Sequence, residues 1–265
     1  MDITGNSKQA TNYTKEYNKA FAQQLNFADK QDFEDAQRGF LGKIEADGIY
    51  REDGHCIWNF KAYDFEGLDA PCPETVNPSL WRQAQLNNIH GLFQVTDKIY
   101  QVRNIDMANM TIIESDTGIV IVDCLTCDEA AKAALELYYS KRGKKPIRAI
   151  CITHTHTDHY GGIGGVITPE EARSGQVPIY APDHFLFEVM SENAYAGNVM
   201  SRRTYNQYGT IMPQNPYGQV DDGLGKTMGS GGTHSIYPPT HIIKEKFETH
   251  VLDGVNFEFM LTPHT

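Results

Sequence analysis

The chain has 265 residues and a net charge of −11, from 23 Lys and Arg against 34 Asp and Glu. This acidic balance disfavours nucleic acid as a partner, because a phosphate backbone binds cationic surfaces. No apolar run approaches the roughly 18 residues of a membrane-spanning helix, and the first residues lack the charged and apolar regions of a signal peptide. We therefore expect a cytoplasmic protein with one or two hydrophobic cores, no membrane span and no nucleic-acid partner.

Residues 1–90 are predicted to form a helical arm followed by an irregular segment. Aromatic or apolar residues recur at positions 13, 17, 21 and 25, which predicts a helix over residues 10–25. A second amphipathic piece begins near Phe33, includes Phe40 and ends at Gly42. Residues 54–78, with three prolines, predict an irregular segment, and Pro78 fits the first turn of a helix that continues to residue 88.

Residues 91–265 are predicted to form an α/β domain that begins with antiparallel hairpins. Short apolar runs predict strands at residues 92–95, 99–102, 110–114 and 119–122. An alanine-rich helix is expected over residues 128–142, with Thr126 and Glu129 as a capping box and Gly143 as its stop. A buried strand over residues 147–153 follows, and Gly161 is expected to open another helix.

The remaining pattern alternates strands and helices around one long loop. A strand is expected at residues 177–181, with helices near 183–192 and 194–208. Residues 209–235 are rich in Gly, Asn and Pro, which predicts a long loop that covers the functional site. Strands are expected again at residues 241–245, 248–252 and 255–261.

The most informative segment is a His-x-His-x-Asp-His motif, formed by His154, His156, Asp158 and His159. Residues two apart in an extended chain face the same side, so His154 and His156 are placed to hold one metal ion. Asp158 and His159 lie past a turn and suit a second ion nearby. Imidazole and carboxylate groups are typical donors of open catalytic zinc sites. The motif therefore predicts two metal ions, in a site where Asp158 is also a catalytic group.

A competing candidate site is the pair Cys124 and Cys127, which follows a strand and opens the helix at residue 128. This placement is typical of a thioredoxin-type redox site, where a helix N-terminus lowers a thiol pKa. Two small buried residues at a strand–helix junction would give the same pattern. The five cysteines do not indicate a disulfide framework, and no second Cys-x-x-Cys pair exists to complete a zinc ribbon.

The order of a strand ending in Asp123, a helix, a strand, the metal motif and Gly161-Gly162 resembles the metallo-β-lactamase superfamily. Within it, the chain is more similar to the alkyl sulfatases, which hydrolyse dodecyl sulfate and similar esters. The likeness extends from about residue 11 to the last residue, and it is carried by residues 102–111, 138–146, 215–218, 223–225 and 261–263. It implies that the helical arm is followed in the sequence by an αβ/βα sandwich, of which this chain contains only the first part.

The resemblance implies a binuclear zinc site that hydrolyses primary alkyl sulfates to an alcohol and sulfate. His154 and His156 would hold one Zn²⁺, and Asp158 and His159 the other. Asp123 matches an acid that supports the site by hydrogen bonds, and it fits equally well as a cap of the loop after its strand.

The substrate-binding residues stay open at this stage, as does assembly into a homodimer. An apolar groove for the alkyl tail is sought among Phe185, Phe187, Met190 and the helix over residues 195–208. Contacts to sulfate are sought among Asn206, Tyr208 and Asn215, because these residues follow the metal loop in the sequence.

The family completes its ligand set with acidic residues and a histidine beyond the segment that matches residues 261–263. We therefore expect this chain to represent the first part of such an enzyme, with little activity alone. One alternative is another hydrolase of this fold, acting on a thioester, lactam or phosphodiester; residues 104–111 and 141–146 argue against it. A second is a fragment without catalysis, which the missing ligands favour.

Overall fold

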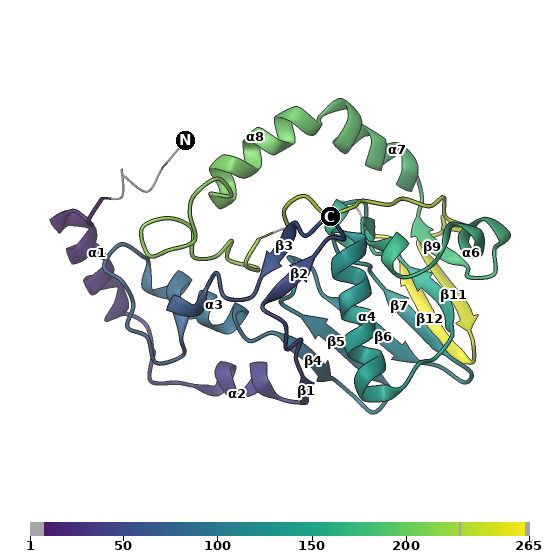
Figure 1. Ribbon diagram of the computed structural model, residues 1–265, viewed down its shortest axis with the longest axis horizontal. Coiled ribbons are helices and arrows are strands. Elements are labelled where there is room, and N and C mark those ends of the chain that lie inside the picture. The colour runs from purple at the N-terminus through teal and green to yellow at the C-terminus, as the bar shows by residue number, and fades with distance from the viewer. Residues whose placement is uncertain (1–7, 228, 263–265) are drawn as a thin grey trace.

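The computed structural model describes residues 8–227 and 229–262, and its centre is an eight-stranded mixed sheet (Figure 1). Residues 263–265, the last of the predicted α/β domain, lie outside the described residues, as do the first residues of the arm. The strand order is β1-β4-β5-β6-β7-β8-β9-β10. In that order the strands are Phe40–Gly42, Gly91–Gln94, Ile99–Arg103, Met110–Glu114, Ile119–Val122, Ile147–Cys151, Ile179–Pro182 and His241–Ile243.

The sheet changes from antiparallel to parallel pairing at β7, because the connections lengthen there. Strands β4 to β7 follow one another as antiparallel neighbours, which confirms the predicted hairpins. Helix α4 (Asp128–Arg142) then carries the chain from the end of β7 to the start of β8, so that β7, β8, β9 and β10 run parallel. Parallel pairing brings the carboxyl ends of β7 and β8 to one edge.

Opposite faces of the sheet are covered by different elements (Figure 1). Ile119 and Ile121 of β7 belong to the larger core, which includes the buried face of α4. Val120, between them, belongs to a second core with Leu252 from the hairpin of β11 (Phe247–Leu252) and β12 (Val255–Met260). This alternation is what a strand buried on both faces requires. The mixed α/β fold with a large central sheet agrees with the predicted class.

The β11–β12 hairpin forms a sheet of its own in the described part of the chain. Each strand therefore has one outer edge that pairs with no described strand. Three of its side chains, Phe247, Val251 and Met260, are each more than 60% exposed. Three strands were expected after residue 240, and all three are present.

The N-terminal arm contains more strand than the sequence predicts. Helix α1 (Asn12–Ala22) and helix α3 (Pro78–Asn87) agree with expectation, and α2 (Gln31–Gln37) ends before Phe40. Phe40 instead begins β1, because Gly39 adopts a φ of 73° and a side chain there would meet the carbonyl oxygen of Gln94 at 2.1 Å. A hairpin of β2 (Gly48–Tyr50) and β3 (Cys56–Asn59) also lies partly where an irregular segment was predicted.

The apolar stripe of α1 packs differently from a core-facing stripe. Tyr13 is 78% exposed and Tyr17 is 56% exposed. Their rings stack along the helix, at 6.4 Å from Tyr13 to Tyr17 and 6.3 Å from Tyr17 to Phe21. The four-residue spacing therefore predicted the helix correctly. It did not predict that the aromatic face would be exposed. The division of the chain at residue 90 stays a prediction, and β1 from before that boundary pairs with β4.

Two local predictions around α4 and the motif are wrong. The N-cap of α4 is Cys127, without a side-chain hydrogen bond, because Thr126 donates its hydroxyl to Asp106 and Glu129 accepts from Thr233. The expected helix at Gly161 begins earlier, as α5 (Thr157–Tyr160). Gly161 is the C-cap of this turn. Glycine is required there, because any side chain would lie 2.2 Å from the carbonyl oxygen of Thr126.

The chain then runs through α6 (Pro169–Ser174), α7 (Phe185–Met190), a π-helical turn (Ser191–Tyr195) and α8 (Gly197–Tyr208). Helices α7 and α8 form an arch that runs along one side of the molecule (Figure 1). None of the described helices is long and apolar enough to span a membrane.

The long loop over residues 209–235 is fixed to the arm by a buried lysine. Lys226 is 2% exposed, and its ammonium contacts Glu66, the carbonyl oxygen of Ala84 at 2.8 Å and Asp221 at 3.3 Å. Burial raises the pKa of Glu66 to about 7, and the adjacent ammonium opposes that increase. A lysine without these oxygens would be too costly to bury, so the loop and the arm hold each other in place.

The C-terminal end of α4 is tied to the sheet by Glu114. Its carboxylate accepts from the hydroxyl of Tyr138 at 2.8 Å and from Arg142 at 3.0 Å, and it lies 2.7 Å from the ammonium of Lys145. Burial alone would raise the pKa of this carboxyl, but the donors outweigh that effect and lower it to about 2.

We expect Glu114→Gln to lower the free energy of unfolding at pH 7 by about 1–2 kcal/mol, after solvent screening is allowed for. Because the folded pKa is depressed, the stabilisation is present above the unfolded pKa near 4.5 and disappears as the pH falls toward 2. Urea unfolding at several pH values measures this. Glu136→Gln, an exposed position on α4, is the control; equal losses at pH 7 would contradict the role of Glu114.

Candidate metal centre and cleft

The motif follows β8 directly, at the edge where the carboxyl ends of the parallel strands meet. Asp123 follows the neighbouring β7, and its backbone N–H donates to the carbonyl of Cys151 at 2.9 Å. Asp123 has a φ of 62°, a left-handed conformation that aspartate tolerates better than most residues. The chain reversal turns the carboxylate toward the loop after β8.

The carboxylate of Asp123 organises that loop. It accepts from the backbone N–H and from the hydroxyl of Thr153, both at 2.8 Å. Its Oδ2 also lies 2.7 Å from Nδ1 of His159. The sequence suggested two roles for Asp123, as a cap of the loop and as a support for a motif histidine. The buried carboxylate makes contacts of both kinds.

The four motif side chains gather as two pairs. Nε2 of His154 lies 3.0 Å from Nδ1 of His156, and Nε2 of His159 lies 3.2 Å from Oδ2 of Asp158. The rings of His154 and His159 are 4.0 Å apart, so the pairs adjoin. These are the same pairs that the spacing assigned to separate ions.

The donor spacing fits a metal ion within each pair. Two ligands at about 2.0–2.1 Å from a tetrahedral ion lie about 3.3 Å from each other, close to the 3.0 and 3.2 Å observed. Among residues 8–227 and 229–262, no group of three or more His, Cys, Asp or Glu side chains is arranged to hold an ion. The described residues therefore bring together two pairs of donors, and each pair would form a half-site with two of the ligands that a metal ion needs.

Electrostatics differ between the two pairs. Burial opposes the charge on His159, but hydrogen bonds to Asp123 and Asp158 prevail and raise its pKa to about 10. Burial would raise the pKa of Asp158, yet its contact with His159 lowers it below the ordinary value. For His154, burial and the two neighbouring imidazoles lower the pKa. One pair is therefore an ion pair, whereas in the other the lowered pKa favours the neutral form of the His154 imidazole.

The motif opens on a cleft of about 720 Å³, between the loop and helix α8. His156, Asp158 and His159 line one wall. The rest of the lining includes Glu192, Met107 and Leu224, together with Met200 and Arg203 from the helix over residues 195–208 that the sequence named for the groove. Glu192 lies 3.7 Å from Nε2 of His156. Leu224 comes from the long loop, so that loop borders the cleft.

The substrate contacts suggested by the sequence divide between the cleft and other places. Tyr208 lines the cleft, whereas Asn206 and Asn215 are absent from its described lining. Phe185 is 1% exposed, in the core beside Tyr160, and Phe187 is 68% exposed, outside the cleft. Met190 is also exposed and outside the lining. Arg203, a cation one helical turn before Gln207 on α8, had no sequence signal beyond its position after the motif.

Asp106 is a further residue that sequence reasoning did not single out as part of the site. It is 1% exposed, and its carboxylate accepts from the backbone N–H and the hydroxyl of Thr126, both at 2.7 Å. It also accepts from the N–H of Met107, which lines the cleft. Burial raises the pKa of Asp106 to about 6 despite these donors. Its signal was its place within the segment 102–111 that carried the resemblance.

The Cys124 and Cys127 pair does not have the properties of a redox site. Both thiols are free and buried. Burial raises the pKa of Cys127 to about 12 and that of Cys124 well above its usual value. A reactive cysteine needs a lowered pKa and access to solvent, so the pair fills the junction between β7 and α4.

Residues 103–243 match the model of the metallo-beta-lactamase superfamily, and the chain belongs to this superfamily. The superfamily implies metal ions, and the motif pairs are the donors that fit them. Among its relatives, the chain is similar to alkylsulfatases. It is 50% identical over 257 residues to a linear primary-alkylsulfatase from Pseudomonas sp., an alignment that covers 97% of this chain and 38% of the relative.

Two further comparisons agree. An alkyl/aryl-sulfatase from Saccharomyces cerevisiae is 45% identical, with 97% of this chain and 40% of that protein covered. The structure of a stereoselective inverting sec-alkylsulfatase from Pseudomonas sp. matches with a TM-score of 0.91 and 45% identity, over 96% of this chain and 40% of that one. The chain thus spans about 40% of the length of these relatives.

We expect Asp123→Asn to weaken the binding of a divalent transition metal by about 10- to 100-fold, because an amide cannot hold the His159 ring as the carboxylate does. Titration with Co²⁺, followed by its absorption, measures the affinity. Asp97→Asn, at an exposed turn, is the control. An unchanged affinity in Asp123→Asn would show that His159 needs no such support.

Proposed function

We propose that this chain carries the metal-binding half-sites and the cleft of a zinc-dependent enzyme that hydrolyses primary alkyl sulfate esters. The observation that carries the proposal is the pairing of four donor side chains, three of which line a 720 Å³ cleft that also contains Arg203. The 50% identity to a linear primary-alkylsulfatase supports the substrate class.

The roles follow from the two pairs. His154 and His156 would hold one Zn²⁺, and Asp158 and His159 the second, with Asp123 fixing the His159 ring through Nδ1. Bound zinc lowers the pKa of water at the site and so supplies a nucleophile near neutral pH. Asp158 lines the cleft, and its lowered pKa favours the ionised carboxylate. In this form it can serve as a metal ligand and as the catalytic group that we assign.

The lining of the cleft is complementary to an amphiphilic anion. An alkyl sulfate has a head with one negative charge and an apolar tail. Arg203 can pair with the head, since a guanidinium donates two parallel hydrogen bonds to an oxyanion, and Tyr208 adds a hydroxyl. Met107, Met200 and Leu224 provide apolar surface for the tail. Met200 lies on the helix that the sequence named for the groove, whereas Phe185, Phe187 and Met190 are absent from the lining of the cleft.

Zinc uptake tests the metal assignment directly. We expect His156→Ala to reduce the zinc retained per chain, because one half-site loses half its donors. Elemental analysis after dialysis against zinc measures the stoichiometry. His184→Ala is the matched control, since His184 is exposed and outside the cleft. Equal zinc content in the two variants would contradict the motif as the metal site.

Sulfate release tests the activity. The described residues offer only two donors in each pair, and catalytic zinc typically has about three protein ligands. We therefore expect the 265-residue chain with zinc to release sulfate from dodecyl sulfate far more slowly than an ordinary enzyme rate of about 10 per second. The release that is observed should fall in Arg203→Gln and in His156→Ala. Turnover near 10 per second would show that two pairs suffice.

The substrate panel should include a secondary alkyl sulfate, an aryl sulfate, a thioester, a β-lactam and a phosphodiester. The proposal predicts the fastest zinc-dependent release from the primary alkyl sulfate. Faster turnover of a substrate without a sulfate ester would favour the alternative of another hydrolase of this fold. Zinc uptake without turnover of any member would favour a chain that needs further protein to act.

A further inference from the structure

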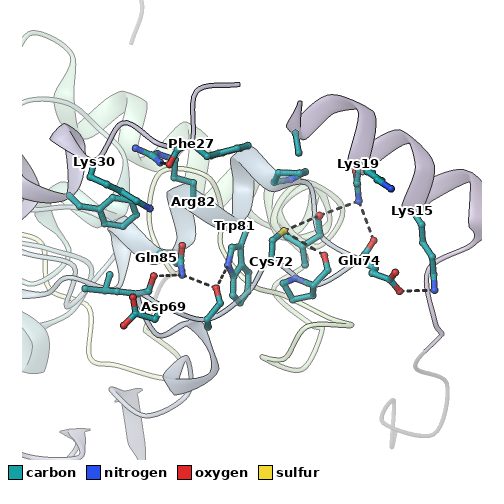
Figure 2. Close-up of a pocket in the computed structure, with 18 of the residues that line it drawn as sticks. Lys15, Lys19, Phe27, Lys30, Asp69, Cys72, Glu74, Trp81, Arg82 and Gln85 are labelled. Carbon is teal, nitrogen blue, oxygen red and sulfur yellow. Dashed lines mark hydrogen bonds and ion pairs between the residues drawn. The ribbon is translucent and has the colours of Figure 1, made fainter. Parts of the chain in front are cut away.

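A second cavity lies in the N-terminal arm, away from the metal motif. It measures about 640 Å³ and lies between α1, α2, α3 and the segment over residues 68–76 (Figure 2). This volume is within the range of about 300–1,000 Å³ typical of small-molecule sites. It shares no lining residue with the metal cleft. The proposed hydrolysis therefore does not account for it.

The cavity has an apolar lining whose polar groups are mostly satisfied. Trp81 and Phe33 are buried, at 4% and 8% exposure, and Phe27 lies nearby (Figure 2). The indole N–H of Trp81 donates to the carbonyl of Ala70 at 3.1 Å. Gln85 donates to three carbonyls of the adjoining segment, the nearest at 2.7 Å. A ligand here meets aromatic and aliphatic surface without displacing these bonds.

Cations line the cavity despite the negative charge of the whole chain. Lys15, Lys19, Lys30 and Arg82 all line it, together with Glu16, Asp69 and Glu74. Lys15 is paired with Glu74 at 2.6 Å, and Arg82 with Asp32 at 2.5 Å.

Lys19 and Lys30 are the cations that remain for a ligand. Neither forms an ion pair with another described residue, and both are labelled at the cavity in Figure 2. The ammonium of Lys30 lies 5.0 Å from the ring centroid of Phe33, which places positive charge beside the apolar lining. Figure 2 shows Lys19 and Lys30 at opposite ends of the cavity, with Phe27 at the end where Lys30 lies. A single unpaired ammonium beside the aromatic lining suits a head group with one negative charge.

We propose that this arm cavity binds an amphiphilic monoanion, with its alkyl chain against Phe27, Phe33 and Trp81 and its head near Lys30. An alkyl sulfate and an alkyl carboxylate share this chemistry. The site is separate from the metal cleft, so its occupancy does not depend on zinc or on hydrolysis. Bound there, an amphiphile is held by the protein but kept away from the motif.

The test uses the metal-free protein with His156→Ala and Arg203→Gln, so that neither a metal centre nor the cation assigned to the sulfate head in the cleft contributes. Calorimetric titration with octyl and decyl sulfate, below their micelle concentrations, should show one saturable site. Each added methylene should tighten binding roughly fourfold if the chain is buried. Octanoate and decanoate form the second arm. Binding of either series supports the site and identifies the head that it accepts; binding of neither overturns it.

Charge variants locate the site. Lys30→Gln should weaken binding roughly fivefold, from the loss of one partly screened charge, whereas Lys19→Gln, at the other end of the cavity, should change it little. Lys144→Gln, an exposed lysine beside α4, should bind as before. Decyltrimethylammonium should bind much more weakly than decyl sulfate. Equal affinity for this cation, or an unchanged affinity for decyl sulfate in Lys30→Gln, would contradict the proposal.

Fluorescence gives an independent readout of position. The chain has two tryptophans, and Trp58→Phe leaves Trp81 as the only emitter. Decyl sulfate should then change the emission of Trp81 with the same midpoint as the calorimetric titration. An unchanged emission during saturable binding would place the ligand elsewhere and overturn the assignment. Failure of sulfate release in the separate activity test would leave these results unaffected.

Discussion

The carboxylate of Asp123 connects the sheet to its chemistry. It lies at the end of β7, holds the backbone and hydroxyl of Thr153 after β8, and contacts the ring of His159. Two parallel strands, the loop between sheet and helix, and one motif imidazole thus share a single anion. Because Asp123 is buried, at 7% exposure, each of these bonds also offsets the cost of removing its charge from water. The orientation of the motif depends on this arrangement.

Much of the sheet and of the motif could be predicted from the sequence, because both depend on local regularities. Strand β6 and helix α4 were predicted with their observed bounds, and the two-residue spacing of His154 and His156 correctly placed them together. Predictions failed where a distant partner decided the outcome. Thr126 did not cap α4, because Asp106 from another loop accepts its hydroxyl hydrogen. Phe40 entered a strand because β4 was available as a neighbour.

The walls of the cleft were the least predictable part of the site. Arg203 and Glu192 belong to the α7–α8 arch, whose path over the motif has no signature in residue spacing. Leu224 reaches the cleft through a loop that is fixed by the buried Lys226 and Glu66, more than 150 residues apart in the chain. A sequence shows the donors that one segment supplies, whereas the surface around them is assembled from segments that only folding brings together.

The β11–β12 hairpin determines how the surface of this chain behaves. It has two outer strand edges that pair with no described strand, and exposed apolar side chains at Phe247, Val251 and Met260. Unpaired backbone donors and acceptors beside apolar groups form a template for strand addition. The solubility of the chain therefore depends on what occupies this hairpin: a covering segment would shield it, whereas bare copies would adhere to one another edge to edge.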